Sequence, residues 1–111
     1  MEYIHNQYYE EKLHIFLALK EGSIADFIEQ KEDVFTNDAS LCVTLLSQML
    51  QAIDYLSHEK IIHRNIKPAN ILYDSKALGK YNFYLANFGL CNNTDFAVSL
   101  AGTREYMAPE V

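Results

Sequence analysis

Tryptophan is absent from this 111-residue chain, and proline, glycine and cysteine are scarce, with two, four and two residues. The low glycine and proline content excludes collagen-like and low-complexity chains. The two cysteines, Cys42 and Cys91, form neither a zinc-ligand spacing nor a disulfide framework. Half of the residues are hydrophobic, which is too many for an intrinsically disordered chain. The length and composition therefore indicate one globular domain or a part of one.

Basic residues are also few, because nine lysines and arginines stand against fifteen acidic residues, giving a net charge of −6. This balance argues against a nucleic-acid partner and against an anionic membrane surface. The start of the chain shows no basic segment followed by an apolar one, so we expect no signal peptide. The most apolar segment, residues 41–56, contains several polar side chains, and we expect it not to span a bilayer. The expected location is intracellular, in the cytoplasm or nucleus.

Alternating hydrophobic residues predict strands in the first part of the chain. Leu13, Ile15, Leu17 and Leu19 would share one face of a strand over residues 12–19. A preceding strand is expected within residues 3–9, with a turn near Asn6 and Gln7. Two further short strands are expected at residues 71–73 and 81–85, joined by a turn that contains Gly79.

Capping residues and helical periodicity predict two helices between these pairs of strands. Residues 23–26 resemble a capping box, which would open a short helix ending near residue 30. A longer helix is expected over residues 38–58, capped by Asn37 or Asp38. Its core face is expected to consist of residues at helical spacing, namely Cys42, Leu45, Leu46, Met49, Ile53 and Leu56. Pro68 places a loop over residues 61–70, and periodicity is lost after Asn87, so the predicted fold class is α+β.

Three motifs in a fixed order carry a resemblance to the protein kinases. The segment His63-Arg64-Asn65-Ile66-Lys67-Pro68-Ala69-Asn70 resembles the catalytic loop, and Asn87-Phe88-Gly89 resembles the metal-binding triplet. Residues 102–110, Gly-Thr-Arg-Glu-Tyr-Met-Ala-Pro-Glu, resemble the end of an activation segment. Lys67 followed by Pro68 is similar to the serine/threonine type of catalytic loop. The resemblance covers nearly the whole chain and implies a partial protein-kinase-like fold, with the last small-lobe strands and the first half of the helical large lobe.

The resemblance also divides the chain into functional parts. Residues 1–19 would supply small-lobe strands and the start of the hinge, and residues 20–60 the first large-lobe helices. Residues 61–89 would run from the catalytic loop to the metal triplet, and residues 90–111 would form the activation segment. The implied cofactors are ATP and Mg²⁺, with ATP contacted by Leu17, Ala18, Leu19, Asn70 and Leu72, and the metal by Asn70 and Asn87. Lys67 would meet the transferred phosphate, and the regulatory or substrate-contacting residues would be Arg64, Thr94, Ser99, Thr103 and Glu110.

Two neutral residues occupy positions where phosphoryl transfer needs negative charge. Asn65 stands where the family has the carboxylate that accepts the substrate proton, and an amide cannot act as a general base. Asn87 stands where the family has the acid that binds Mg²⁺, and a neutral carbonyl is a weaker ligand for that cation. The glycines at 22, 79, 89 and 102 form no glycine-rich phosphate loop. We therefore expect weak or absent binding of ATP and Mg²⁺.

Three hypotheses on function follow from these residues. The first is a catalytically inactive, pseudokinase-like protein that acts by binding another kinase or a kinase substrate. The second is an active serine/threonine protein kinase of atypical type, or a truncated piece of one. The third is a decayed gene copy without a function, since each exchange of aspartate for asparagine needs a single base substitution.

Overall fold

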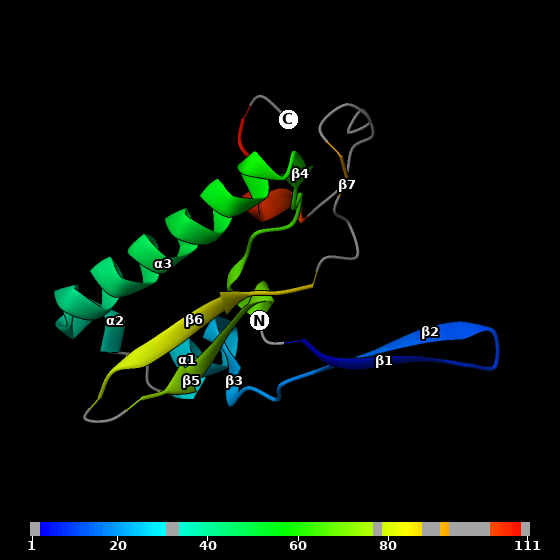
Figure 1. Ribbon diagram of the computed structural model, residues 1–111. Coiled ribbons are helices and arrows are strands. Elements are labelled where there is room, and N and C mark those ends of the chain that lie inside the picture. Colours follow the sequence, from blue (N-terminus) through cyan, green and yellow to red (C-terminus); the bar gives the residue numbers. More distant parts are fainter. Residues whose placement is uncertain (1–2, 31–33, 77–78, 88–91, 94–102, 110–111) are drawn as a thin grey trace.

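A computed structural model describes residues 3–30, 34–76, 79–87, 92–93 and 103–109 (Figure 1). The strands are β1 (Tyr3–Tyr9), β2 (Lys12–Leu17), β3 (Gly22–Ser23), β4 (Ile61–Ile62), β5 (Ile71–Ser75), β6 (Tyr81–Leu85) and β7 (Asn92–Asn93). The α-helices are α1 (Ile24–Gln30), α2 (Val34–Asn37) and α3 (Ala39–His58), and short 3₁₀ turns lie at Pro68–Asn70 and Arg104–Tyr106. This mixture of helices and antiparallel strands confirms the predicted α+β class.

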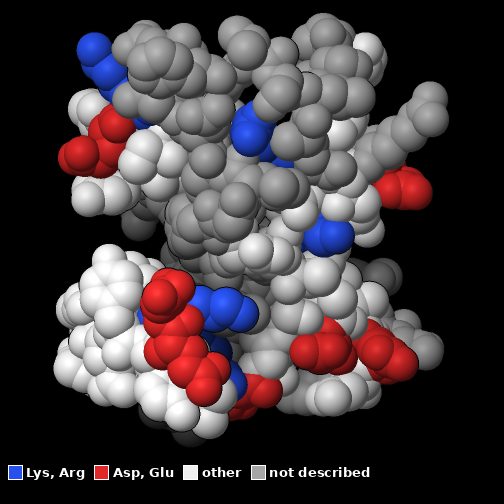
Figure 2. All heavy atoms as spheres, turned by 90° about the vertical axis from the view of Figure 1, so that its right-hand side faces the viewer, with Lys and Arg blue, Asp and Glu red and all other residues white. Residues whose placement is uncertain are grey.

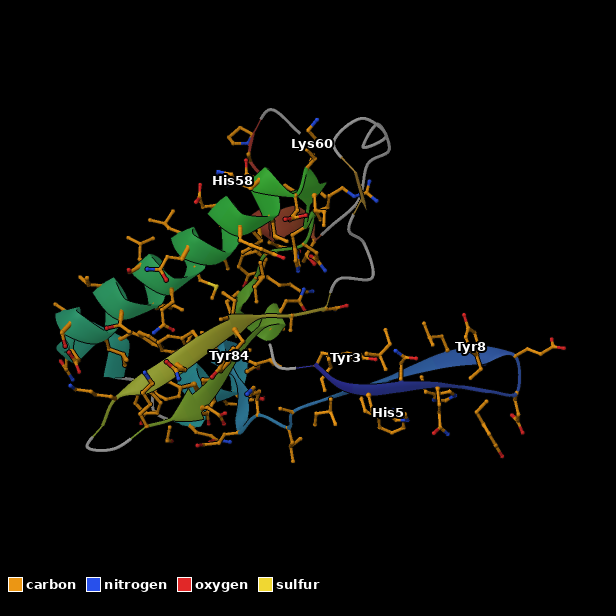
Figure 3. The ribbon with its side chains drawn as sticks, viewed as in Figure 1. Tyr3, His5, Tyr8, His58, Lys60 and Tyr84 are labelled. Carbon is orange, nitrogen blue, oxygen red and sulfur yellow. The ribbon has the colours of Figure 1, made fainter. Side chains whose placement is uncertain are left out.

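Strands β1 and β2 form an antiparallel hairpin that extends away from the rest of the molecule (Figure 1). Every side chain of both strands is exposed. The predicted turn near Asn6 was wrong, because β1 runs unbroken to Tyr9 and the turn consists of Glu10 and Glu11, which both have positive φ. Tyr3 and Tyr8 point to one side of the hairpin and His5 to the other (Figure 3).

The body of the fold is a three-stranded antiparallel sheet in the order β3-β5-β6, with α1 and α3 packed against it. The predicted capping box opens α1: the backbone N–H of Asp26 donates to Ser23 Oγ (3.2 Å), and the N–H of Ser23 donates to Asp26 Oδ2 (3.1 Å). Helix α2 was not predicted. Asp38 caps α3, because its Oδ1 accepts from the N–H of Leu41 (3.2 Å).

Phe27 of α1 lies at the centre of the core and is fully buried. Its ring contacts those of Phe35, Tyr73 and Tyr81, with centroids 5.4, 4.9 and 5.1 Å away. Offset and edge-on aromatic pairs of this kind stabilise a core beyond their buried area. The other buried apolar residues come from α1, α3, β5 and β6: Ile24, Leu41, Met49, Leu56, Ile71, Tyr73, Phe83 and Leu85.

Helix α3 lies along β6 and is tied to it by a side chain, since Gln48 Oε1 accepts from the N–H of Phe83 (2.6 Å). Met49 and Leu56 are buried as predicted, whereas Cys42, Leu46 and Ile53 are exposed, so the predicted core face was partly wrong. The buried face is rotated toward Leu41, and hydrophobic residues occupy a second face as well. By length and composition alone α3 is apolar enough to cross a membrane, contrary to the expectation from its polar side chains, although core helices of soluble proteins share this property.

Candidate functional site

The catalytic-loop segment begins directly after β4, whose two residues pair with β7. Arg64 adopts a positive φ of 71°, which redirects the backbone, and Pro68 then starts the 3₁₀ turn that leads into β5. Proline is suited to this position because its fixed φ matches the first residue of a turn and its missing N–H is not needed there. The predicted loop over residues 61–70 is therefore a short strand, an irregular stretch and one turn.

Asn65 and Lys67 both contact Thr103, which comes from the far end of the chain. Asn65 Oδ1 accepts from the backbone N–H of Thr103 (3.0 Å) and from Thr103 Oγ1 (2.7 Å). The Lys67 ammonium group donates to Thr103 Oγ1 (2.7 Å). The amide oxygen of Asn65 is thus fully used as an acceptor within the protein. The arrangement can orient a hydroxyl group, but it offers no group that takes up a proton at neutral pH.

Asn70 and Asn87 contact each other through their side-chain amides. The Nδ2 of Asn87 donates to Asn70 Oδ1 (3.1 Å), and the Nδ2 of Asn70 donates to the backbone oxygen of Asn65 (2.7 Å). Asn70 is buried and Asn87 is exposed with a φ of 59°, a left-handed conformation that asparagine adopts more readily than most residues. The two residues that the sequence assigned to a metal are therefore joined directly by one hydrogen bond, with Asn87 as donor and Asn70 as acceptor.

His63 joins the catalytic-loop segment to the residues that follow β6. Its Nδ1 accepts from the backbone N–H of Asn65 (3.1 Å), so its Nε2 carries the hydrogen and donates to the backbone oxygen of Ala86 (2.7 Å). The N–H of Ala86 in turn donates to the backbone oxygen of Asn70 (2.8 Å). Residues 63–70 and 86–87 are consequently held together by hydrogen bonds that need no ion.

The hinge residues lie between the hairpin and the three-stranded sheet. Leu17 and Leu19 are 46% and 95% exposed, and Ala18 is half-buried. Leu72 lies opposite Ser23 in the β3–β5 pair, so it is close in the fold to the end of the hinge. The contact of Leu17, Ala18, Leu19 and Leu72 with ATP stays a prediction.

Lys20, which the sequence places at the end of the predicted hinge, makes specific contacts with the sheet. Its ammonium group forms an ion pair with Asp74 of β5 (3.2 Å) and lies 4.2 Å from the ring centroid of Tyr84, which Figure 3 labels on β6. Glu21 accepts from the N–H and the hydroxyl of Ser75 (2.8 and 2.9 Å). These contacts fix the chain after the hinge onto β5 and β6. Nothing in the sequence indicated that Lys20 and Glu21 would pair with residues of β5.

The donor set of the site does not fit a divalent cation. Its members Asn65, Asn70 and Asn87 are all neutral, whereas Mg²⁺ favours anionic oxygen ligands. Among the residues that the structure describes, no group of three or more histidine, cysteine, aspartate or glutamate side chains could hold a metal. On the face shown in Figure 2, acidic and basic side chains of the described residues are interspersed with uncharged ones.

The structure brings together five of the residues singled out from the sequence: Asn65, Lys67, Asn70, Asn87 and Thr103. Arg64 is half-buried beside this group. The predictions for Thr94, Ser99 and Glu110 lie outside the described residues. Assignment of these residues to catalysis, ATP or regulation stays a prediction.

A family comparison matches the whole chain, residues 1–111, to the protein kinase domain. The calcium/calmodulin-dependent protein kinase type 1 of Macrobrachium nipponense is 34% identical over 93% of this chain and 30% of its own length. The mitogen-activated protein kinase kinase kinase 1a of Physcomitrium patens is 37% identical over 100% of this chain and 14% of its own length. A probable serine/threonine-protein kinase of Dictyostelium discoideum is 35% identical over 92% of this chain and 22% of its own length. The chain thus spans less than a third of the length of each of these relatives.

Proposed function

Because this chain belongs to the protein kinase family, with serine/threonine kinases as its relatives, we propose that it is a pseudokinase-like segment that binds proteins without transferring phosphate. The observation that carries the proposal is the exchange of both functional acids for amides, at Asn65 and Asn87. The site keeps the family's order of motifs and lacks the charges on which the family's reaction depends.

The first support concerns the proton of the substrate hydroxyl. Removing a positioned general base costs roughly 10²–10⁴ in rate in typical enzymes. Asn65 cannot replace such a base, and its oxygen already accepts two hydrogen bonds from Thr103. A hydroxyl that approached Asn65 would therefore compete with Thr103 for the same acceptor.

The second support concerns ATP and Mg²⁺, which the family resemblance implies. Asn87 donates its amide hydrogen toward Asn70, so a cation between the two residues would meet a donor where it needs a ligand. Without a bound cation, the negative charge of the nucleotide phosphates loses its main compensating partner, and the Lys67 ammonium group already donates to Thr103. We propose that ATP and Mg²⁺ bind weakly or not at all.

The third support is the amount of exposed apolar surface, which fits a protein that functions by binding. Large hydrophobic side chains are exposed on the hairpin and on α3, among them Tyr8 (75%) and Val43 (65%). Large exposed apolar patches are rare on monomeric soluble proteins and commonly mark interaction sites. The proposed partner is another kinase or a kinase substrate protein, in the cytoplasm or nucleus.

A chimaeric kinase separates the effect of the two asparagines from that of the chain's length. Residues 61–109 of this chain would replace the matching segment in a complete calcium/calmodulin-dependent protein kinase, and transfer of labelled phosphate from ATP to a protein substrate would be measured with Mg²⁺ and with Mn²⁺. We expect no transfer above background from the chimaera, and recovery in the Asn65→Asp, Asn87→Asp double variant.

Two outcomes decide the proposal. Turnover of the unsubstituted chimaera at the rate of the parent kinase would refute it, because the amides would then support the reaction. If the double variant did not recover phosphate transfer, the cause of the inactivity would lie elsewhere in the segment. The two asparagines would then not explain the loss of activity. The single variants Asn65→Asp and Asn87→Asp serve as matched controls, and neither is expected to recover fully.

A further inference from the structure

The side-chain amide of Asn65 has a fixed orientation in the candidate site. Its Oδ1 accepts from the backbone N–H of Thr103 (3.0 Å) and from the Thr103 hydroxyl (2.7 Å). A backbone N–H can only donate, so the amide atom that meets it must be the oxygen and not the nitrogen. The Nδ2 of Asn65 is therefore directed away from the N–H of Thr103.

The two hydrogens on Asn65 Nδ2 remain available to a ligand. Among the residues that the structure describes, no partner accepts a hydrogen bond from Nδ2, because the bonds of this side chain all go to Oδ1. Asn65 is half-buried, and no buried side-chain nitrogen or oxygen of the described residues lacks a partner. Nδ2 is therefore an unpaired donor that still reaches solvent.

Lys67 adds a positive charge beside this donor. Its ammonium group donates to Thr103 Oγ1 (2.7 Å), the same hydroxyl that donates to Asn65, so the side chains of Lys67 and Asn65 are neighbours. An ammonium group carries three hydrogens, and Thr103 takes one of them. Within the described ranges no carboxylate forms an ion pair with Lys67, whereas Lys20 is neutralised by Asp74.

The site consequently offers donors and positive charge to a ligand, because its one side-chain acceptor, Asn65 Oδ1, is already occupied. A phosphate monoester supplies the complement, with a charge of about −1.5 to −2 at pH 7 and three strong acceptor oxygens. Hydrogen bonds from a cation to such an anion are roughly twice as strong as those between neutral groups. An uncharged hydroxyl group would gain much less from the same donors.

We propose that Asn65 and Lys67 bind the phosphate group of a phosphorylated serine or threonine side chain on a partner protein. The position of Thr103 supports a protein ligand, since it shows that a hydroxyl oxygen carried by a polypeptide can contact both residues at 2.7 Å. The proposal rests on the proposed function, because it specifies the partner that a segment without phosphate transfer would bind at this site.

An aspartate in place of Asn65 would reverse the preference of the site. One carboxylate oxygen could keep both contacts with Thr103. The other would stand where Nδ2 now donates, and a carboxylate oxygen can only accept. Its negative charge would repel a phosphate, and this repulsion is stronger in a partly buried site than in water. The exchange keeps the shape of the side chain and changes the sign of its interaction with the ligand.

The test is a nuclear magnetic resonance titration of the ¹⁵N-labelled 111-residue chain, in the absence of ATP and metal. The probe is a short alanine peptide with phosphoserine at its centre, and the reference ligand is the same peptide with serine. We expect the dissociation constant of the phosphopeptide to be lower by at least about tenfold. The side-chain amide signal of Asn65 should shift on binding, since Nδ2 would donate to the phosphate.

Variants of the two binding residues locate the phosphate. Asn65→Asp and Lys67→Met should each raise the dissociation constant of the phosphopeptide at least about tenfold, and Lys67→Arg should retain binding because the charge is kept. Gln51→Glu is the matched control, because it makes the same change of amide to carboxylate on an exposed position of α3 and should have no effect. Unchanged backbone signals in the three-stranded sheet would establish that each variant keeps its fold.

The outcomes separate this proposal from the proposed function. Equal affinity for the two peptides would overturn the proposal, and so would phosphopeptide binding that Asn65→Asp leaves unchanged. Tighter binding of inorganic phosphate or metal-free ATP than of the phosphopeptide would also overturn it, because the ligand would then be a free phosphate or a nucleotide. Phosphorylation of the serine peptide after addition of ATP and Mg²⁺, detected by mass spectrometry, would instead refute the pseudokinase-like function.

Discussion

Changing Asn87 to aspartate is expected to make the folded state depend on divalent cations. In the protein, Asn87 Nδ2 donates to the buried amide oxygen of Asn70 over 3.1 Å. An aspartate has the same shape but no hydrogen to donate, so two oxygen atoms would face each other. Aspartate also tolerates the left-handed backbone conformation at this position, so the change introduces no backbone strain.

The magnitude follows from the hydrogen bond that is lost. Leaving a buried acceptor without a partner costs about 1–3 kcal/mol. For a domain of this size that loss lowers the melting temperature by roughly 5–15 °C. In the Asn87→Asp variant, a divalent cation between the new carboxylate and the Asn70 oxygen would offset the loss, since a ligand at a hundred times its dissociation constant stabilises by about 2.7 kcal/mol.

Thermal unfolding followed by circular dichroism, with excess Mn²⁺ or with a chelator, tests this reasoning. Asn87→Asp should melt below the wild type in chelator and recover with Mn²⁺, while the wild type should not respond to the ion. Gln7→Glu makes the same chemical change on the exposed hairpin and should respond to neither condition. Equal stability of Asn87→Asp and the wild type in chelator, or stabilisation of the wild type by Mn²⁺, would show that the amide pair has been misinterpreted.

Three further predictions concern the fold. Phe27→Ala should lower the free energy of unfolding by about 3–5 kcal/mol in urea titrations and Phe27→Leu by clearly less, because the ring fills the centre of the core. Gln48→Ala should cost about 1–3 kcal/mol in the same assay, since it leaves the N–H of Phe83 without its acceptor, and an unchanged midpoint would contradict this. The hydrogen bond to the Asp54 backbone oxygen, followed by the Asp54 charge, raises the pKa of His58 above 6.5. Its stabilising contribution is therefore complete below pH 6.5 and lost as the pH rises through the raised pKa, so melting temperatures of the wild type, but not of His58→Gln, should decline slightly over that range.

The elements that depend on local chemistry could be predicted from the sequence. The capping box at Ser23 and the cap at Asp38 set the starts of α1 and α3, and both signals act over three residues. The hairpin turn could not be located, because Asn6 and Gln7 resemble turn residues more than Glu10 and Glu11 do, yet the pairing of the two strands places the turn at the glutamates.

The burial of α3 and the detail of the site depend on distant parts of the chain. Periodicity showed that α3 is apolar but could not show which of its two apolar faces meets the sheet, so Leu46 and Ile53 were assigned to the wrong one. The sequence motifs identified Asn65 and Asn87 as candidate site residues. The order of the motifs predicted that the two residues belong to one site. The sequence could not show that Asn87 donates to Asn70 or that Thr103 donates to Asn65. These residues are 17 and 38 positions apart, and only the fold sets their relative positions.

The amide pair of Asn70 and Asn87 has a consequence for how this segment could change over generations. An amide both donates and accepts, so the buried Asn70 accepts from Asn87 and donates to the backbone oxygen of Asn65, and its polar atoms are paired within the protein. If the proposed function is correct, the shape of this region no longer depends on residues that also carry charge for a metal. Selection on a binding surface could preserve the fold of this region indefinitely while exerting no pressure to bring the acids back.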